Sequence, residues 1–352
     1  MSNDPTLTSI RGRGASGNPP GRFDARWFES EEEPAGAPPP ETQVFVDATR
    51  GIIARNDSPD IGFSQSINPY RGCEHGCSYC FARPSHAFLN LSPGLDFETK
   101  IFTKPEAATL LRKELARPGY VCSPIALGTN TDPYQPLERR LRITRGILEV
   151  LAEHEHPFTI VTKSALVVRD LDLIAPAAAR HQAEVHLSIT TLDPGLASRM
   201  EPRAATPARR LETLRALAAA GVPCGVMAAP MIPGLNDHEL ERILEAARDA
   251  GATSAGWVLL RLPHELKGLF ESWLELHEPK QAGKVLSRIR ETRAGGLYDA
   301  RFGARQRGEG VYAEMLARRF DVAAGRLGLD RRHEPLDVSR FRKPGPKGLF
   351  DR

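Results

Sequence analysis

Cysteine is scarce in this sequence, with 5 among 352 residues. A disulfide scaffold is excluded because three of the five fall within eight consecutive positions, as Cys73, Cys77 and Cys80. This grouping favours a metal site in a reducing compartment. Cys122 and Cys224 stand apart from the group, and we interpret both as buried structural thiols.

Long apolar runs and a strong excess of one charge are also missing. No stretch approaches the roughly 18 apolar residues that span a bilayer, and the first residues lack the apolar core of a secretory signal. Hydrophobic residues make up 41%, charged residues 26%, and the net charge is +3, a globular composition that excludes fibrous and wholly disordered proteins. We expect a cytoplasmic monomer that does not enter a membrane.

The composition divides the chain into three parts. Residues 1–43 are dense in Gly, Pro and charge without apolar periodicity, which predicts a disordered N-terminal arm. Residues 44–262 form the expected core, and residues 263–352 a helical extension. Between Lys280 and Arg352 there are 18 Lys plus Arg and 9 Asp plus Glu. This excess fits either a phosphate-bearing partner such as nucleic acid or a solvated helix surface.

Short apolar runs alternate with helical patterns throughout the core. Strands are expected at Gln65–Tyr70, Pro124–Gly128, Phe158–Thr162, Val185–Thr190, Gly225–Met231 and Gly256–Arg261. Helices are expected at Lys104–Arg117, Leu137–Glu153, Arg169–Arg180, Pro207–Ala220 and Asp237–Ala250, then at Glu265–Leu276, Gly283–Thr292 and Gly310–Leu327 in the extension. The repetition indicates an α/β fold with a parallel sheet, either open or closed into part of a barrel. Both arrangements place the working surface at the C-terminal ends of the strands.

The motif Cys73-x3-Cys77-x2-Cys80 follows the first expected strand, within SINPYRGCEHGCSYCFARPSH. Three soft thiolates on a short loop are typical ligands of an iron–sulfur cluster. A tetrahedral zinc site needs a fourth ligand, which His75 or His86 would supply. The spacing alone leaves both metals open.

With Tyr79 before its last cysteine, the motif resembles the signature of the radical S-adenosylmethionine enzymes. The segments Gly128–Glu138, His186–Asp193 and Ala229–Asp237 are similar to the branch that contains spore photoproduct lyase and its uncharacterised bacterial relatives. The resemblance implies a partial (βα)6 TIM-like barrel. It also implies one [4Fe-4S] cluster on the three cysteines, with its fourth iron open to S-adenosylmethionine. A donor such as flavodoxin or ferredoxin would supply the electron that releases a 5′-deoxyadenosyl radical, and the substrate would be a nucleic acid or nucleotide.

Polar residues at the expected strand ends are candidates for binding the coenzyme. Asn130 and Asp132 suit the methionine amino group, Lys163 the methionine carboxylate. Ser188 and Thr190 share one face of their strand and suit the ribose. The alternatives are a capped turn before Pro133 and an ordinary exposed lysine.

Further candidates come from the resemblance. Tyr79 belongs to the motif, and Met231 lies in the segment similar to the one against which the family's adenine packs, although core packing explains a methionine equally well. Arg199, Glu201 and Arg261 are candidates for substrate contact, against the alternative of surface salt bridges. Two rival functions remain: a zinc-stabilised nucleic-acid-binding module, and an electron-transfer protein without coenzyme chemistry.

Overall fold

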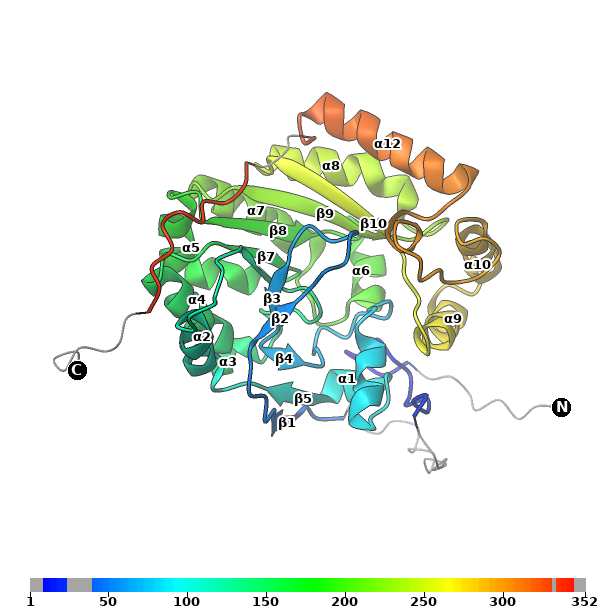
Figure 1. Ribbon diagram of the computed structural model, residues 1–352. Coiled ribbons are helices and arrows are strands. Elements are labelled where there is room, and N and C mark those ends of the chain that lie inside the picture. The colour runs from blue at the N-terminus through cyan, green and yellow to red at the C-terminus, as the bar shows by residue number, and fades with distance from the viewer. Residues whose placement is uncertain (1–8, 24–39, 331–333, 345–352) are drawn as a thin grey trace.

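The computed structural model describes residues 9–23, 40–330 and 334–344 (Figure 1). Within these ranges seven strands form one sheet in the order β10-β9-β8-β7-β6-β3-β2. The strands are β2 (Ile53–Arg55), β3 (Gln65–Ile67), β6 (Ile125–Leu127), β7 (Phe158–Thr162), β8 (Ala183–Ser188), β9 (Cys224–Met231) and β10 (Ser254–Leu259). All neighbours run parallel except β2, which pairs antiparallel with β3. The predicted α/β fold with a partial TIM-like barrel is confirmed.

Helices connect the parallel strands and cover the outside of the sheet (Figure 1). They are α2 (Ala107–Leu115), α3 (Glu138–Leu141), α4 (Ile143–Glu153), η2 (Ala165–Asp170), α5 (Leu171–Ala178), α6 (Pro194–Met200), α7 (Pro207–Ala219), η3 (Asp237–Glu239) and α8 (Leu240–Asp249). The single helix expected over Leu137–Glu153 is broken at Arg142, whose φ of 54° is left-handed. This break makes α3 a separate short turn.

Fully buried apolar side chains form the centre of the sheet. Leu127 is paired in register with Ile160, and Leu187 with Val226, and none of the four is accessible to solvent. Such burial is typical of parallel strands covered by helices. It leaves the strand ends as the place for polar side chains.

A small second sheet lies beside the barrel, in the order β1-β5-β4. Its strands are β1 (Gln43–Val46), β5 (Lys100–Thr103) and β4 (Tyr70–Arg71), and the helices η1 (Arg83–Leu89) and α1 (Leu95–Thr99) lie between β4 and β5 in the chain. The single strand expected over Gln65–Tyr70 is therefore two strands in different sheets. The loop with the three cysteines starts directly after β4.

Residues 9–23 do not form a disordered arm. The backbone N–H groups of Gly14 and Ala15 are buried and donate to the carboxylate of Glu98 at 3.1 and 2.9 Å. Asn18 and Asp96 exchange side-chain and backbone hydrogen bonds next to them. The prediction of disorder is wrong for this segment because two carboxylates satisfy its backbone and side-chain donors. Residues 1–8 and 24–39, also assigned to the arm, lie outside the described residues.

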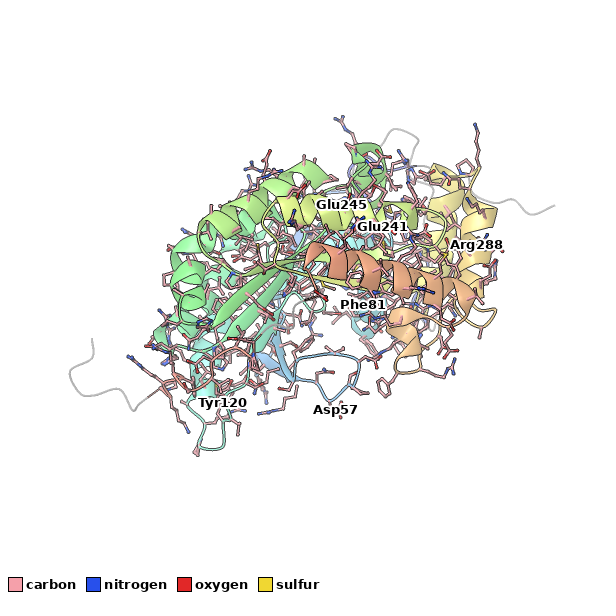
Figure 2. The ribbon with its side chains drawn as sticks, turned by 90° about the horizontal axis from the view of Figure 1, so that it is seen from above. Asp57, Phe81, Tyr120, Glu241, Glu245 and Arg288 are labelled. Carbon is pink, nitrogen blue, oxygen red and sulfur yellow. The ribbon has the colours of Figure 1, made fainter. Side chains whose placement is uncertain are left out.

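The C-terminal extension is helical, as expected. It comprises α9 (Leu266–His277), α10 (Ala282–Glu291), α11 (Ala304–Arg307) and α12 (Val311–Leu327). Helix α12 lies along α8, where Glu241 pairs with Arg319 and Glu245 with Arg326 (Figures 1 and 2). No helix in the described ranges is both long and apolar enough to cross a membrane.

Candidate active site

The cysteine loop is held by backbone hydrogen bonds to two other elements. Cys73 N–H donates to the carbonyl of Phe97 at 2.9 Å, and Ser78 N–H to that of Met200 at 2.9 Å. Gly72 and Gly76 have φ of 80° and 67°, which side-chain-bearing residues rarely adopt. Cys73 and Cys77 are buried and Cys80 is partly exposed. The loop therefore has a fixed shape in which two of its three thiols are shielded from water.

The surroundings of the thiols govern their ionisation. Burial raises the pKa of all three cysteines, that of Cys77 to about 12. Lys163 acts in the opposite direction on both Cys77 and Cys80. Thiolates bind metals, and a bound metal is a strong enough charge to deprotonate a coordinating thiol. The donor set, three thiols on a rigid loop with a nearby ammonium, fits an iron–sulfur cluster.

Asp132, predicted at the end of β6, connects the barrel to the cysteine loop. Its carboxylate accepts from Thr162 Oγ1 and from the backbone N–H of Lys163, both at 2.7 Å, and lies 3.4 Å from His75 Nδ1. Burial alone would raise the pKa of Asp132, but the neighbouring His75 ring and these hydrogen bonds lower it to about 2. The ionised carboxylate thus links the loop after β6 to the end of β7 and to His75 in the cysteine loop.

Four side chains at the end of β8 form a buried polar cluster. Tyr79 O–H donates to Glu201, and Thr190 Oγ1 donates to the same carboxylate at 2.6 Å. The other oxygen of Glu201 forms an ion pair with Arg210. Burial favours the neutral acid, yet Arg210 and Lys163 outweigh it and lower the pKa of Glu201 to about 2. The structure thus brings Tyr79, Thr190 and Glu201 together, although the sequence assigned the first two to the coenzyme and Glu201 to the substrate.

Lys163 lies at the end of β7 between the cysteine loop and this cluster. Its Nζ is 5.8 Å from the centroid of the Tyr79 ring, within cation–π distance. Ser188, the last residue of β8, is buried and its carbonyl accepts from Arg210 at 2.9 Å. Both residues lie where the sequence predicted them, at the C-terminal ends of neighbouring strands.

Other predicted residues have different surroundings. Met231 is completely buried and belongs to the main hydrophobic core. Arg199, on α6, forms an ion pair with Glu278 at 2.6 Å. Asn130 is exposed, and its backbone N–H donates to the Asn68 side chain at 3.0 Å. The first two match the alternatives of core packing and an ordinary salt bridge.

Arg261 lies near the last cysteine of the motif. Its guanidinium carbon is 4.8 Å from the ring centroid of Phe81, the residue that follows Cys80. Its buried Nε has no hydrogen-bond partner. Phe81, labelled in Figure 2, is 41% exposed. An aromatic ring and an arginine thus form an accessible pair beside the cysteine loop.

The histidines considered as zinc ligands have other partners. His75 faces Asp132, and His86 Nε2 contacts the carbonyl of Lys100 at 3.0 Å. Across the described ranges, no three side chains of His, Cys, Asp or Glu gather closely enough to surround one metal ion. In a cluster each cysteine binds a different iron, so its three thiols need not converge on a single point.

Sequence reasoning missed two buried arginines near the site. Arg83 donates to the carbonyl of Cys77 at 2.9 Å and pairs with Glu98, and Arg210 pairs with Glu201. Arg210 had a detectable signal, because it occupies the apolar stripe of its helix, four residues before Leu214. A charge on a stripe that faces the core requires a buried partner.

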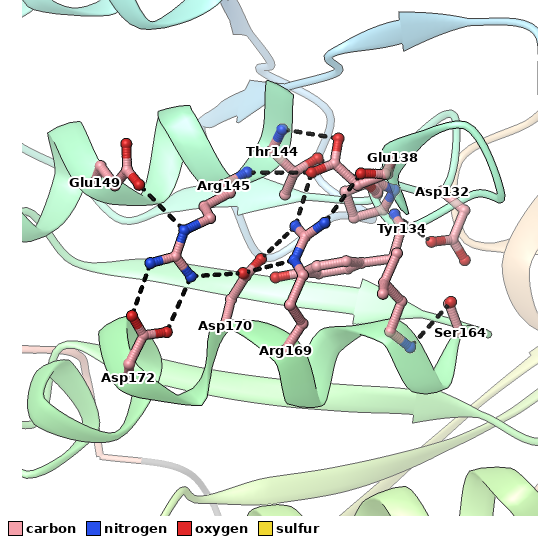
Figure 3. Close-up of polar contacts among 12 residues, drawn as sticks. Asp132, Tyr134, Glu138, Thr144, Arg145, Glu149, Ser164, Arg169, Asp170 and Asp172 are labelled. Carbon is pink, nitrogen blue, oxygen red and sulfur yellow. Dashed lines mark hydrogen bonds and ion pairs between the residues drawn. The ribbon is translucent and has the colours of Figure 1, made fainter. Parts of the chain in front are cut away.

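A network of charges behind the site was also missed (Figure 3). Glu138 on α3 binds Arg169 at 2.8 Å, Arg169 binds Asp170 at 2.7 Å, and Asp170 binds Arg145 at 3.0 Å. Tyr70 O–H also donates to Glu138. These contacts fix α3 against β4, where the cysteine loop begins.

The fold and the site define a class of protein, an α/β partial barrel with a three-cysteine loop at the C-terminal ends of its parallel strands. The family model described as the radical SAM superfamily matches residues 67–247, which are 181 of the 352 residues. The chain belongs to the radical SAM superfamily. The family implies an iron–sulfur cluster and S-adenosylmethionine, and the thiol donor set described above fits such a cluster.

Several similar proteins are uncharacterised. Uncharacterised proteins of Mycobacterium tuberculosis and Mycobacterium bovis are each 39% identical over 292 residues, covering 82% of both chains. An uncharacterised protein of Methanocaldococcus jannaschii is 28% identical over 178 residues, covering 51% of this chain and 64% of its own. A solved variant of spore photoproduct lyase has a TM-score of 0.52 at 18% identity, covering 81% of this chain and 77% of its own. That likeness confirms the fold.

Proposed function

We propose that the chain binds one [4Fe-4S] cluster through Cys73, Cys77 and Cys80 and cleaves S-adenosylmethionine reductively to a 5′-deoxyadenosyl radical. When bound, the cluster would supply the electron for cleavage and an open iron for the coenzyme. The observation that carries the proposal is the three-cysteine loop, fixed at the strand ends beside the Lys163 ammonium. The membership in the radical SAM superfamily supports it.

The chain's own residues divide into binding and positioning groups in this proposal. Lys163 would bind the methionine carboxylate, and the exposed Asn130 the amino group. The carboxylates of Asp132 and Glu201 are occupied by protein donors, so we assign them to positioning. Ser188 and Thr190 would line the ribose.

For the substrate we propose a nucleic acid or nucleotide. Bases stack on exposed aromatic rings and on arginine planes, and Phe81 with Arg261 provides such a pair next to Cys80. The variant Phe81→Ala should weaken binding of a single-stranded oligonucleotide, whereas Phe88→Ala, which removes an exposed ring near Arg22, should not. Equal binding by both variants and the unmodified protein would contradict the substrate proposal.

The test of radical chemistry is anaerobic reconstitution with iron and sulfide, reduction with dithionite, and chromatography of 5′-deoxyadenosine after addition of S-adenosylmethionine. Single Ala variants of Cys73, Cys77 and Cys80 should abolish both the visible absorbance of the cluster and the product. The Cys122→Ala variant is the matched control and should retain both. If the protein holds an intact cluster but forms no 5′-deoxyadenosine, either with or without oligonucleotide, an electron-transfer function would be favoured. If the protein is colourless and binds zinc, a structural metal site would be favoured.

A further inference from the structure

Several arginines in the described part of the basic extension form ion pairs. Arg305 pairs with Asp60 at 2.7 Å and Arg319 with Glu241 at 2.6 Å. Arg301 binds both Asp299 and Glu309. The excess of positive charge in the sequence is therefore a poor guide to where an anionic partner binds.

Arginines without ion pairs occur elsewhere, on and just after α3. Arg139, Arg140 and Arg142 are exposed, and within the described ranges none of them has a carboxylate partner. The nearest acid in sequence, Glu138, is buried and points towards Arg169 (Figure 3). It also accepts a hydrogen bond from Tyr70 O–H. The broken helix thus separates one buried negative charge from three exposed positive charges.

Two of these arginines, Arg139 and Arg140, border a depression that reaches the cysteine loop. It has a volume of about 310 Å³ and is lined by Glu74, Pro136, Leu137, Arg139, Arg140 and Arg203. Glu74 immediately follows Cys73 and is buried, pairing with Arg203 at 3.1 Å and accepting from Thr42 at 2.8 Å. Three arginines against one carboxylate leave the depression positively charged.

We propose that this depression is the docking face for an acidic protein that carries one electron, an inference that rests on the proposed function. One electron would leave the reduced carrier, which is oxidised, and enter the cluster next to Cys73, which is reduced. Complementary charge speeds encounter and fixes orientation, as a transient electron-transfer complex requires. The lining contains no aromatic residue, so it lacks the stacking surface typical of single-stranded nucleic-acid sites.

The test compares Arg139→Glu/Arg140→Glu with a control of equal charge change, Arg215→Glu/Arg318→Glu, which alters exposed arginines on α7 and α12. Binding of oxidised bacterial flavodoxin is measured by calorimetry at low and high salt. The Arg139/Arg140 variant should raise the Kd by about tenfold or more at low salt, and the control by less than about twofold. Flavodoxin-driven formation of 5′-deoxyadenosine should fall in parallel, whereas dithionite-driven formation should be unchanged.

Each outcome separates the docking proposal from the proposed function. Equal flavodoxin binding by both variants would overturn the docking face even if dithionite-driven cleavage is normal. Absence of cleavage with dithionite in the unmodified protein would instead defeat the proposed function, and the binding measurement would still report on docking. Loss of oligonucleotide binding with retention of flavodoxin binding would assign the face to nucleic acid and overturn the proposal.

Discussion

Glu201 keeps a negative charge in a place from which water is excluded. Its two oxygens receive Arg210 on one side and Tyr79 and Thr190 on the other, and 3% of the residue is exposed. Removing one partner of a buried ion pair leaves an uncompensated charge, which is more costly than losing an exposed pair. Stability at this position therefore depends on both members being present.

The substitution Arg210→Met should lower the free energy of unfolding by about 3 kcal/mol near neutral pH, because it leaves Glu201 buried without its cation. Urea unfolding followed by circular dichroism measures the change. The matched control is Arg209→Met, which removes the neighbouring exposed arginine and its pair with Glu212. A loss no larger than that of the control would show that the buried pair contributes little.

Glu201 and Asp132 make the stability of the fold depend on pH in the acid range. The pKa of Glu201 is lowered from 4.5, and that of Asp132 from 3.8, to about 2 in the folded protein. Their ionised forms stabilise the fold fully above the unfolded pKa values, and this contribution is lost as the pH falls from about 4.5 towards 2. Urea unfolding at a series of pH values should show stability falling in that window, less steeply in Glu201→Gln. An identical slope in that variant would contradict the assignment.

At the scale of elements, the cysteine loop depends on a segment far from it in sequence. Residues Gly14 and Ala15 donate to Glu98, Glu98 pairs with Arg83, and Arg83 donates to the carbonyl of Cys77. A Cβ atom on Gly14 would lie 1.7 Å from the carbonyl oxygen of Gly76. Only glycine permits this approach, so the segment and the loop fit together as one unit.

The substitution Gly14→Ala should detach the segment, whereas Gly17→Ala should not, because a Cβ on Gly17 meets nothing within 4 Å. Detachment exposes Arg13, whose guanidinium contacts the carbonyl of Glu98 at 3.1 Å. Trypsin should therefore cut after Arg13 about tenfold faster in the Gly14 variant, a ratio that corresponds to roughly one charge-assisted hydrogen bond. Mass spectrometry of the fragments measures the rate of cleavage. Equal rates in the two variants would contradict the close fit between the segment and the cysteine loop.

At the scale of the whole molecule, the tail after α12 returns to the end of the barrel opposite the cysteine loop. Phe341 packs against His156 and Tyr120, with ring centroids 5.2 and 5.6 Å away. The backbone N–H of Arg342 donates to the carbonyl of His154 at 2.9 Å. Figure 1 shows this stretch in red beside α5. The tail thus covers the loop that enters β7.

The substitution Phe341→Ala should lower the free energy of unfolding by about 1–2 kcal/mol, since it removes two aromatic contacts and their buried area. Thermal unfolding measures the loss. Phe302→Ala, which removes a ring that is 61% exposed, is the comparison and should have a smaller effect. Dithionite-driven cleavage should survive the Phe341 substitution, because that ring lies at the opposite end of the barrel from the cysteine loop.

The barrel could be predicted because the short apolar runs of its strands alternate regularly with helical patterns. Phe158–Thr162 was predicted with its correct bounds, since its alternating burial follows from consecutive aromatic and β-branched residues. The small sheet could not be predicted, because β1 is exposed at all four positions and β4 has only two residues. Its pairing depends on contacts between distant segments.

The candidate site, like the fold, could be predicted only in part. Asp132, Lys163 and Thr190 could be located because polar residues at the C-terminal ends of parallel strands face the site. The fold brings all three towards the cysteine loop. The same reasoning could not identify Arg83 or Glu98, because neither residue lies at the end of a barrel strand. Their role follows from the ion pair between them, which the sequence does not reveal. The chemical roles of all these residues stay predictions.

The order in which the chain is synthesised adds a consequence to the contacts of residues 9–23. This segment precedes all its partners in the chain, and besides Glu98 it borders a small cavity shared with Leu269 and Trp273 of α9. A segment cannot dock on a helix that has not yet left the ribosome. Residues 9–23 therefore leave the ribosome before all of their partners, and they can complete their contacts only after α9 has been synthesised.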